Sequence, residues 1–424
     1  MELVPPRGTD DLLPPRADAM LGLYDQAHRL ARLFGYRYVE TPVFEHTDLF
    51  ARTSGDTSDV VTKEMYTFED KGGRSLTLRP EGTAPIIRAY LAHAHDLGSP
   101  FRAYYVNTAY RHGRPQAGRL REFRVFGVEV IGSAAPAADL EAIEVADRYL
   151  RARELRDVVL HLNSIGDQTC RPAYRELLTS YLEPYEDQLD QDCRSRLRTN
   201  PMRVLDCKVD GTKDFVLAAP VISDHLCDAC AEHFAAVRDG LAEAGVGYEH
   251  DPRLVRGLDY YTRTAFEFVS GSLPQAQAAT VCGGGRYDGL AEVLGGPATP
   301  GVGFGMGLDR VLLAMEAEGV PVPAERTPTC FVVAIGDAAR SAAGRLVREL
   351  RDAGVAAMTA LEERPMKAQF RMADRAGATF VAIIGEQELE QGQVTIRRLD
   401  DGVQKEVAVD DVVNWLTRLE DPMR

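Results

Sequence analysis

The sequence YRHGRPQAGRLREF occupies residues 110–123 and joins two strand-like runs, residues 102–110 and 120–131. A polar loop between two apolar runs of this kind predicts a β-hairpin. Other strand-like runs lie at 75–78, 159–163, 265–269 and 301–305, and helical patterns at 17–35, 83–97, 139–150 and 308–318. The hairpin favours a largely antiparallel sheet, and the interspersed helices indicate an α+β fold.

Two segments depart from this pattern. Residues 166–245 are charged, mostly helical in pattern and bounded by glycines, which predicts a helical insertion. After the proline-rich residues 321–328, two apolar runs without alternation are typical of strands buried on both faces. We therefore expect a core over residues 1–325, interrupted at 166–245, and a small α/β domain with a mixed sheet over 326–424.

Length and charge set limits on function. A chain of 424 residues is too long for one compact core. A net charge of −15 argues against binding nucleic acid over the whole surface, yet residues 111–124 concentrate five arginines and a histidine against one acid. We find no membrane-spanning run and no secretory pattern, so we expect a cytoplasmic chain whose seven cysteines are reduced.

Five segments carry polar or glycine-rich chemistry. Arginines in the hairpin loop suit phosphate, and the glycines of 301–307 leave a strand face open to a flat ligand before Arg310 in the next helix. Glu81 and Thr83 can hold an ammonium group, whereas Tyr260 and Tyr261 suit a small aromatic ligand. Taken singly, each segment equally fits an ordinary structural role. The hairpin loop fits a solvated loop, 301–310 a tight strand–helix junction, and 79–83 a helix N-terminus. Residues 254–264 fit a strand with its tyrosines on opposite faces, and the glycine cluster 283–289 fits a turn.

Together the segments resemble class II histidyl-tRNA synthetases, and the resemblance covers essentially the whole chain. Residues 41–45 resemble motif 1, the dimer-forming segment, 110–132 motif 2 and 301–310 motif 3. The two histidine-specific motifs of the family are matched by 254–264 and 283–289, and further family sequence by 79–84, 367–369 and 384–386.

The resemblance implies a class II antiparallel sheet with flanking helices and a C-terminal α/β anticodon-binding domain. It also implies that a homodimer uses ATP and Mg²⁺ to activate histidine as histidyl-adenylate, and then transfers it to tRNA(His). Arg111 would bind the α-phosphate, Arg310 the γ-phosphate, and Arg119 also ATP; Arg256 would stabilise charge as the carboxylate attacks. Histidine would contact Glu81, Gly82 and Thr83 through its amino group, Glu129 and Tyr261 through its imidazole, and Tyr260 and Tyr287 along the pocket wall.

Two positions depart from the family pattern. Gly113 stands where motif 2 usually has glutamate, and Val125 where the family usually has glutamine. They leave open a paralogue that activates an amino acid for another acceptor. A non-catalytic regulatory subunit of ATP phosphoribosyltransferase is the other alternative, although Arg256 and the C-terminal domain count against it.

Cysteines offer one partial metal-binding pattern. Cys227 and Cys230 form a C-x-x-C pair, with Cys207 and His233 as further candidate ligands for zinc. Because only one such pair exists and helical spacing equally explains Cys230 and His233, we expect no metal site.

Overall fold

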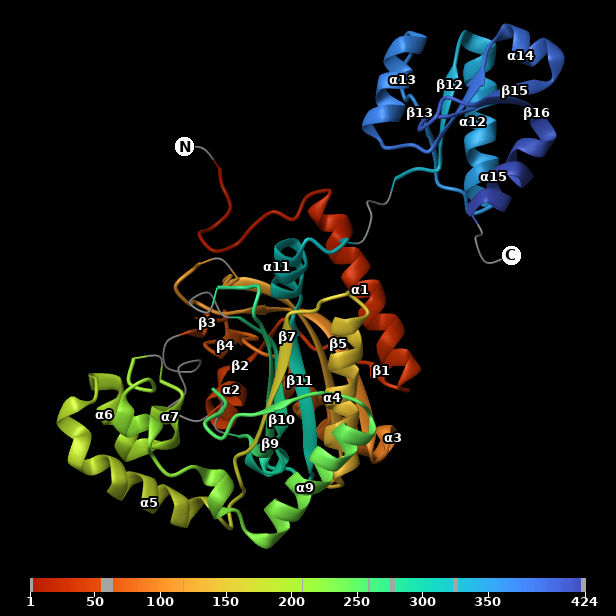
Figure 1. Ribbon diagram of the computed structural model, residues 1–424. Coiled ribbons are helices and arrows are strands. Elements are labelled where there is room, and N and C mark those ends of the chain that lie inside the picture. The colour runs from red at the N-terminus through yellow and green to blue at the C-terminus, as the bar shows by residue number, and fades with distance from the viewer. Residues whose placement is uncertain are drawn as a thin grey trace. The chain divides into compact units, whose positions relative to one another are not determined.

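The structure is a computed structural model that describes residues 3–54, 64–116, 118–207, 209–257, 260–274, 279–322 and 327–420. The chain forms two compact units, Met1–Ala324 and Glu325–Arg424 (Figure 1). Parts of four predicted segments lie outside the described residues: 323–326 of the linker, 258–259 of the tyrosine segment, 117 of the hairpin loop and 208 of the insertion. No helix in the described ranges is long and apolar enough to cross a membrane.

An eight-stranded sheet organises the first unit, in the order β1-β5-β6-β11-β10-β9-β7-β8. The strands are β1 (Arg37–Tyr38), β5 (Phe101–Tyr110), β6 (Glu122–Ile131), β7 (Val158–Ser164), β8 (Glu249–His250), β9 (Thr262–Ser270), β10 (Thr280–Arg286) and β11 (Gly301–Gly307). The six central strands are antiparallel, and only the edge pairs β1–β5 and β7–β8 are parallel. The predicted hairpin and the antiparallel sheet are therefore confirmed.

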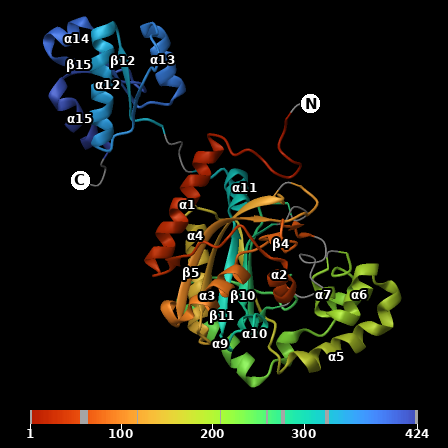
Figure 2. The same cartoon turned by 180° about the vertical axis from the view of Figure 1, so that it is seen from behind.

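Four helices cover one face of this sheet: α1 (Arg16–Leu33), α4 (Pro136–Arg151), α9 (Asp228–Glu243) and α11 (Leu308–Glu318). Figure 2 shows α1 and α4 beside each other over the strands. Because side chains alternate along a strand, Phe126, Val128 and Val130 of β6 enter this core together with Val302, Phe304 and Met306 of β11.

The opposite face carries α3 (Thr83–Leu97), α10 (Leu290–Val293) and α2 (Thr47–Ser54), with a small antiparallel sheet of β2 (Phe44–His46), β4 (Ser75–Leu78) and β3 (Thr67–Glu69). On this face β11 presents only its alternate glycines. A Cβ atom at Gly303 would lie 1.9 Å from Glu129 Oε2, so no larger residue fits there. The glycines leave an open space against the backbone.

Helices fill the predicted insertion, namely α5 (Arg171–Leu182), η2 (Glu183–Gln188), α6 (Gln191–Thr199), α7 (Met202–Leu205), α8 (Asp214–Leu217), η3 (Ile222–His225) and α9. The last of these does not belong to the lobe that the others form. Phe234, Val237 and Leu241 lie at helical spacing on α9 and pack into the core of the main sheet. The separate lobe is therefore shorter than the predicted insertion.

The second unit holds a five-stranded mixed sheet in the order β13-β12-β14-β15-β16. Its strands are β12 (Cys330–Ala334), β13 (Ala357–Thr359), β14 (Phe380–Ile384), β15 (Gln393–Arg398) and β16 (Gln404–Ala408), and its helices α12 (Asp337–Asp352), α13 (Met366–Arg375), α14 (Glu386–Gln391), η5 (Val409–Asp411) and α15 (Val412–Glu420). The first three strands in that order are parallel and the last two antiparallel, so the predicted mixed sheet is confirmed.

Candidate active site

A cavity of about 290 Å³ lies on the glycine face of the large sheet. All five predicted segments contribute to its wall. The predicted site residues on the wall are Arg111, Arg119, Arg256, Arg310, Glu81, Gly82, Thr83, Tyr260 and Tyr261. Glu129 and Tyr287 lie directly behind the wall, hydrogen-bonded to each other. The fold thus brings distant polar segments to one cavity.

The buried carboxyl of Glu129 is the centre of a hydroxyl network. Glu129 Oε1 accepts from Thr83 Oγ1 at 2.7 Å and from Tyr105 at 3.3 Å, while Oε2 accepts from Tyr287 at 2.5 Å. Burial raises the pKa of Glu129 to about 8, against the hydrogen bonds, which lower it. At neutral pH the carboxyl therefore holds a proton that a bound base can share.

Glu81 combines a structural contact with a place on the cavity wall. Its oxygens accept from the backbone amides of Thr83 at 2.6 Å and Ala84 at 2.8 Å, so it caps the N-terminus of α3. Burial raises the pKa of Glu81. The helix-terminus interpretation of this segment is thus correct for the contacts of Glu81, and the same carboxyl also faces the cavity.

Aromatic rings and Arg256 form another wall. Tyr260 and Tyr261 both line the cavity with ring centroids 4.7 Å apart, so the alternative that placed them on opposite faces is wrong. Tyr287 meets Tyr260 edge to face at 6.1 Å. The Arg256 guanidinium lies 5.4 Å from the centre of the Tyr261 ring and pairs with Glu267. This wall can hold a flat cation or a heteroaromatic ring.

Three arginines on the cavity wall, Arg111, Arg119 and Arg310, lie close together. Arg111 donates to the carbonyl of Pro80 at 2.8 Å, and Arg310 donates to those of Gly118 at 2.8 Å and Thr280 at 2.7 Å. Burial, and then the charges of Arg111 and Arg119, lower the pKa of Arg310 to about 10. Mutually repelling guanidinium groups at one wall are stabilised by a polyanion such as a triphosphate.

Comparison with known proteins identifies the family. The family model described as "Histidyl-tRNA synthetase" matches residues 8–169 and 184–311, and the "Anticodon binding domain" model matches 329–419. The chain is 46% identical over 417 residues to a histidine–tRNA ligase of Moorella thermoacetica, covering 98% of each. The chain belongs to the histidyl-tRNA synthetase family. A Geobacillus thermodenitrificans histidine–tRNA ligase is also 46% identical, over 97% of each chain.

Solved structures agree with this family assignment. The apo histidyl-tRNA synthetase of S. aureus matches with a TM-score of 0.82 and 37% identity, over 98% of this chain and 100% of that one. A Bacillus halodurans structure, described as an ATP phosphoribosyltransferase regulatory subunit/histidyl-tRNA synthetase, is 23% identical with a TM-score of 0.64, which shows the fold alone. As in the family, the class II-type sheet here is joined to a C-terminal α/β anticodon-binding domain.

The two positions that depart from the family pattern both line the cavity. Beside Gly113 stands Glu64, a residue that sequence reasoning missed. Its backbone carbonyl accepts from His112 at 2.7 Å, and a Cβ atom at Gly113 would lie 3.3 Å from its Oε1. Glu64 also pairs with Arg119. A carboxylate from a distant segment is thus present where motif 2 lacks one.

Two other neighbours of the predicted residues were missed, Tyr105 and Glu267. Tyr105 could have been predicted from the alternation of side chains along a strand. On β5 it stands opposite Gly127 of β6, and Glu129, two residues further along β6, lies on the same face. Glu267 on β9 accepts from Thr280 Oγ1 at 2.9 Å as well as from Arg256. No local pattern marked Glu267 or Glu64, since both reach the site through pairing with an arginine from another segment.

Cys207 and His233, the further candidate ligands that the sequence offered, do not join Cys227 and Cys230. His233 Nε2 lies 3.3 Å from Asp139 Oδ1 inside the core, where helical spacing on α9 directs it. Cys207 lies beside Asp190, with its Sγ 3.8 Å from Oδ2.

Proposed function

We propose that this chain activates histidine with ATP and then transfers it to tRNA(His). A histidine carboxylate oxygen attacks the α-phosphorus, the bond to the bridging oxygen of the β-phosphate breaks, and pyrophosphate leaves. A ribose hydroxyl of the tRNA then attacks the carbonyl carbon of the adenylate, and AMP leaves. The observation that carries the proposal is one cavity that has three arginines on its wall and the Glu129 hydroxyl network against it.

Histidine would occupy the part of the cavity in front of Glu129. The ring would exchange hydrogen bonds with Glu129 and Tyr261, along a wall formed by Tyr260 and Tyr287. Its ammonium group would meet Glu81, Thr83 and the backbone at Gly82, where a side chain would collide with Tyr105 at 2.4 Å. This arrangement places the amino-acid carboxylate toward Arg256, whose charge would offset the charge that develops as the carboxylate attacks.

ATP would lie against the three arginines of the wall. Arg111 would hold the α-phosphate, Arg310 the γ-phosphate, and Arg119 would also contact the nucleotide. The described carboxylates here, Glu64 and Asp309, are already paired with Arg119 and Arg124. These two carboxylates fit a Mg²⁺ ion that would bind mainly to the phosphates of ATP and to water. Glu64 or Asp309 would then contact the ion through one of its waters. The ion would offset phosphate charge.

The acceptor is tested by two assays in sequence. Histidine-dependent ATP–pyrophosphate exchange reports the first step, and charging of total tRNA reports the second. We expect both activities. Exchange without charging would mean that the activated amino acid goes to another acceptor, and absence of both would favour a regulatory role, so either result contradicts the proposal.

Substitution of Val125 by glutamine tests whether the pocket is already complete for histidine. Asn107 of β5 stands opposite Val125 of β6, and its Oδ1 is buried without a hydrogen-bond partner among the described residues. With Asn107, Glu81 and Thr83 present, we expect Val125→Gln to change the histidine Kd by less than about tenfold, the range of one neutral hydrogen bond. Calorimetric titration measures it. A much larger gain in affinity would mean that the native pocket is tuned for another amino acid.

We also propose that the chain forms a homodimer through the motif 1 region. Apolar side chains Val43, Phe44 and Phe68 are 43–49% exposed there, and the rings of Phe44 and Phe68 meet at 6.2 Å. Exposed apolar patches of this kind mark interfaces. We expect light scattering to give twice the mass of one chain, and Phe44→Asp to give the monomer mass. The matched control Leu361→Asp, at a 98% exposed position of the second unit, should remain dimeric.

A further inference from the structure

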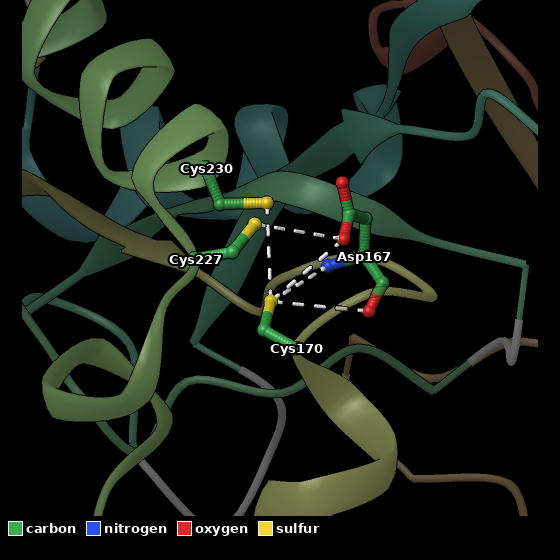
Figure 3. Close-up of side chains that lie close together, drawn as sticks. All are labelled: Asp167, Cys170, Cys227 and Cys230. Atoms are coloured by element: carbon green, nitrogen blue, oxygen red, sulfur yellow. Dashed lines mark hydrogen bonds between the residues drawn. The ribbon is translucent and has the colours of Figure 1, made fainter.

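Four metal-binding side chains meet where the insertion leaves the main sheet and returns to it. Asp167 and Cys170 follow the end of β7, whereas Cys227 caps α9 and Cys230 lies in its first turn. Their side chains point toward one another in Figure 3. One ligand atom from each lies within 4.8 Å of all the others. Sequence spacing had suggested only half of this group, because the other half comes from the far end of the insertion.

The separations fit four ligands around one tetrahedral ion. The Sγ atoms of Cys170 and Cys230 are 3.9 Å apart, and Asp167 Oδ1 is 3.8 Å from Cys170 Sγ and 4.0 Å from Cys227 Sγ. A tetrahedral zinc ion with bonds of about 2.3 Å to sulfur separates its sulfur ligands by about 3.8 Å. All these cysteines are free thiols, so no disulfide occupies the position.

The donor set selects the class of metal. Three thiolates are soft ligands, which suit zinc and exclude calcium or magnesium, whose ligands are oxygen atoms. An iron–sulfur cluster holds its cysteines on two or more iron atoms, so the ligand atoms would have to be spread around the whole cluster.

The surroundings of Asp167 complete the site. Its Oδ2 accepts from Arg263 Nη2 at 3.2 Å, and its Oδ1 accepts from the amide of Thr169 at 2.9 Å. Arg263 thereby orients the carboxylate and offsets part of the negative charge of the ligands. Gly166 has φ +63°, and a Cβ atom there would lie 2.6 Å from Cys170 Sγ, so the loop approaches the thiol only with glycine.

A second group, Asp190, Cys193, Cys207 and Asp210, is equally compact but less suited to a metal. Asp190 Oδ1 caps α6 by accepting from the amide of Cys193 at 2.7 Å. Asp210 pairs with Lys213 at 2.6 Å and accepts from the amide of Asp190 at 2.9 Å. With two thiols and both carboxylates engaged, this group is a natural comparison for the first.

We propose that Asp167, Cys170, Cys227 and Cys230 form a structural zinc site that ties the two ends of the insertion together. The site is independent of the proposed catalytic function. It does stand behind the cavity, because Arg263 follows Tyr261 by two residues and Arg171, in the first turn of α5, donates to the Tyr261 carbonyl. The ion would therefore hold the base of the lobe and the backbone beneath the Tyr261 ring.

Metal analysis of the full-length chain tests the proposal. We expect about one zinc per chain after purification without chelators, and loss of that zinc in Cys170→Ser and Cys227→Ser. The matched control Cys193→Ser, in the second group, should keep it. Cobalt substituted for zinc should give the sulfur-to-cobalt charge-transfer band and the strong visible bands of a tetrahedral thiolate site, and Cys227→Ser should lose both.

Other results would overturn the proposal. Wild type that holds no zinc and takes up no cobalt would do so, as would loss of zinc from Cys193→Ser while Cys227→Ser keeps it. Thiol titration of the denatured, metal-stripped chain should find all seven cysteines, and two fewer would indicate a disulfide instead. If the serine variants fail to fold, Asp167→Asn serves instead, because asparagine has the same shape as aspartate. This variant should lose zinc to a coloured chelator more readily than wild type, and equal retention of zinc would contradict the proposal.

Discussion

Replacing Arg111 by glutamine should slow histidine-dependent ATP–pyrophosphate exchange by about 100-fold to 1,000-fold. A preorganised donor aimed at charge that develops in the transition state contributes this much when it acts in a water-excluded site. Glutamine can still donate to the Pro80 carbonyl that Arg111 contacts at 2.8 Å, so the loop keeps its anchor. The effect should fall mainly on kcat, with a smaller rise in the KM for ATP.

Arg114→Gln is the matched control for this variant. Arg114 lies in the same loop but is exposed and does not line the cavity. Arg114→Gln removes the same charge as Arg111→Gln. Because salt screens the effect of an exposed charge that does not touch the substrate, the rate of exchange should stay within about twofold of wild type. Similar losses in both variants would mean that loop charge, not contact with the reacting phosphate, explains the effect of Arg111. An unchanged melting temperature would exclude unfolding as the cause.

Glu129→Gln should raise the Kd for histidine by about 10-fold to 100-fold, because a hydrogen bond to a charged group contributes ~1.5–3 kcal/mol. Glu129 and the imidazole share one proton in the proposed complex, as an acid with a neutral ring or as a carboxylate with imidazolium. Glutamine keeps the shape and two hydrogen-bonding atoms but offers no such proton. Calorimetric titration at pH 7 measures the change, and ATP binding, measured in parallel, should be unaffected. A histidine Kd within twofold of wild type would contradict the proposed contact between Glu129 and the bound histidine.

The same variant should change how stability depends on pH. The pKa of Glu129 is about 8 in the folded chain, above its value of about 4.5 in the unfolded chain, so unfolding releases a proton. The contribution of the protonated carboxyl is fully present below about pH 4.5 and is lost as the pH rises to about 8. The ligand-free wild type should therefore lose melting temperature relative to Glu129→Gln across this range, and the difference should level off above it. A constant difference would contradict the raised pKa.

Local patterns were enough to predict most of the large sheet. A polar loop between apolar runs predicted the β5–β6 hairpin, and apolar residues between glycines marked β11 as a strand with one bare face. The partition of the insertion was not predictable in this way. Nothing between residues 228 and 243 distinguishes a helix of the lobe from one that packs on the sheet, because Phe234 and Leu241 form the same amphipathic stripe in either case.

The residues of the candidate site likewise fall into those that local patterns predict and those that they do not. Residues in recognisable segments, such as Arg310 after its glycine strand, could be predicted, and the structure places them on one cavity wall. Glu64, Glu267 and the grouping of Asp167 with Cys227 depend on which distant segments become neighbours. Such pairings carry no local periodicity, so they emerge only once the sheet order is known.

The bare strand face also limits how this pocket could be redesigned. Added side chains at Gly303 or Gly127 would meet Glu129 at 1.9 Å or Tyr105 at 2.2 Å, and at Gly283 they would meet Arg256 at 2.3 Å. Mutational scanning should therefore find these positions intolerant even of alanine. A change of amino-acid preference would have to begin at side chains that already face the cavity, such as Val125, which has no polar contact to lose.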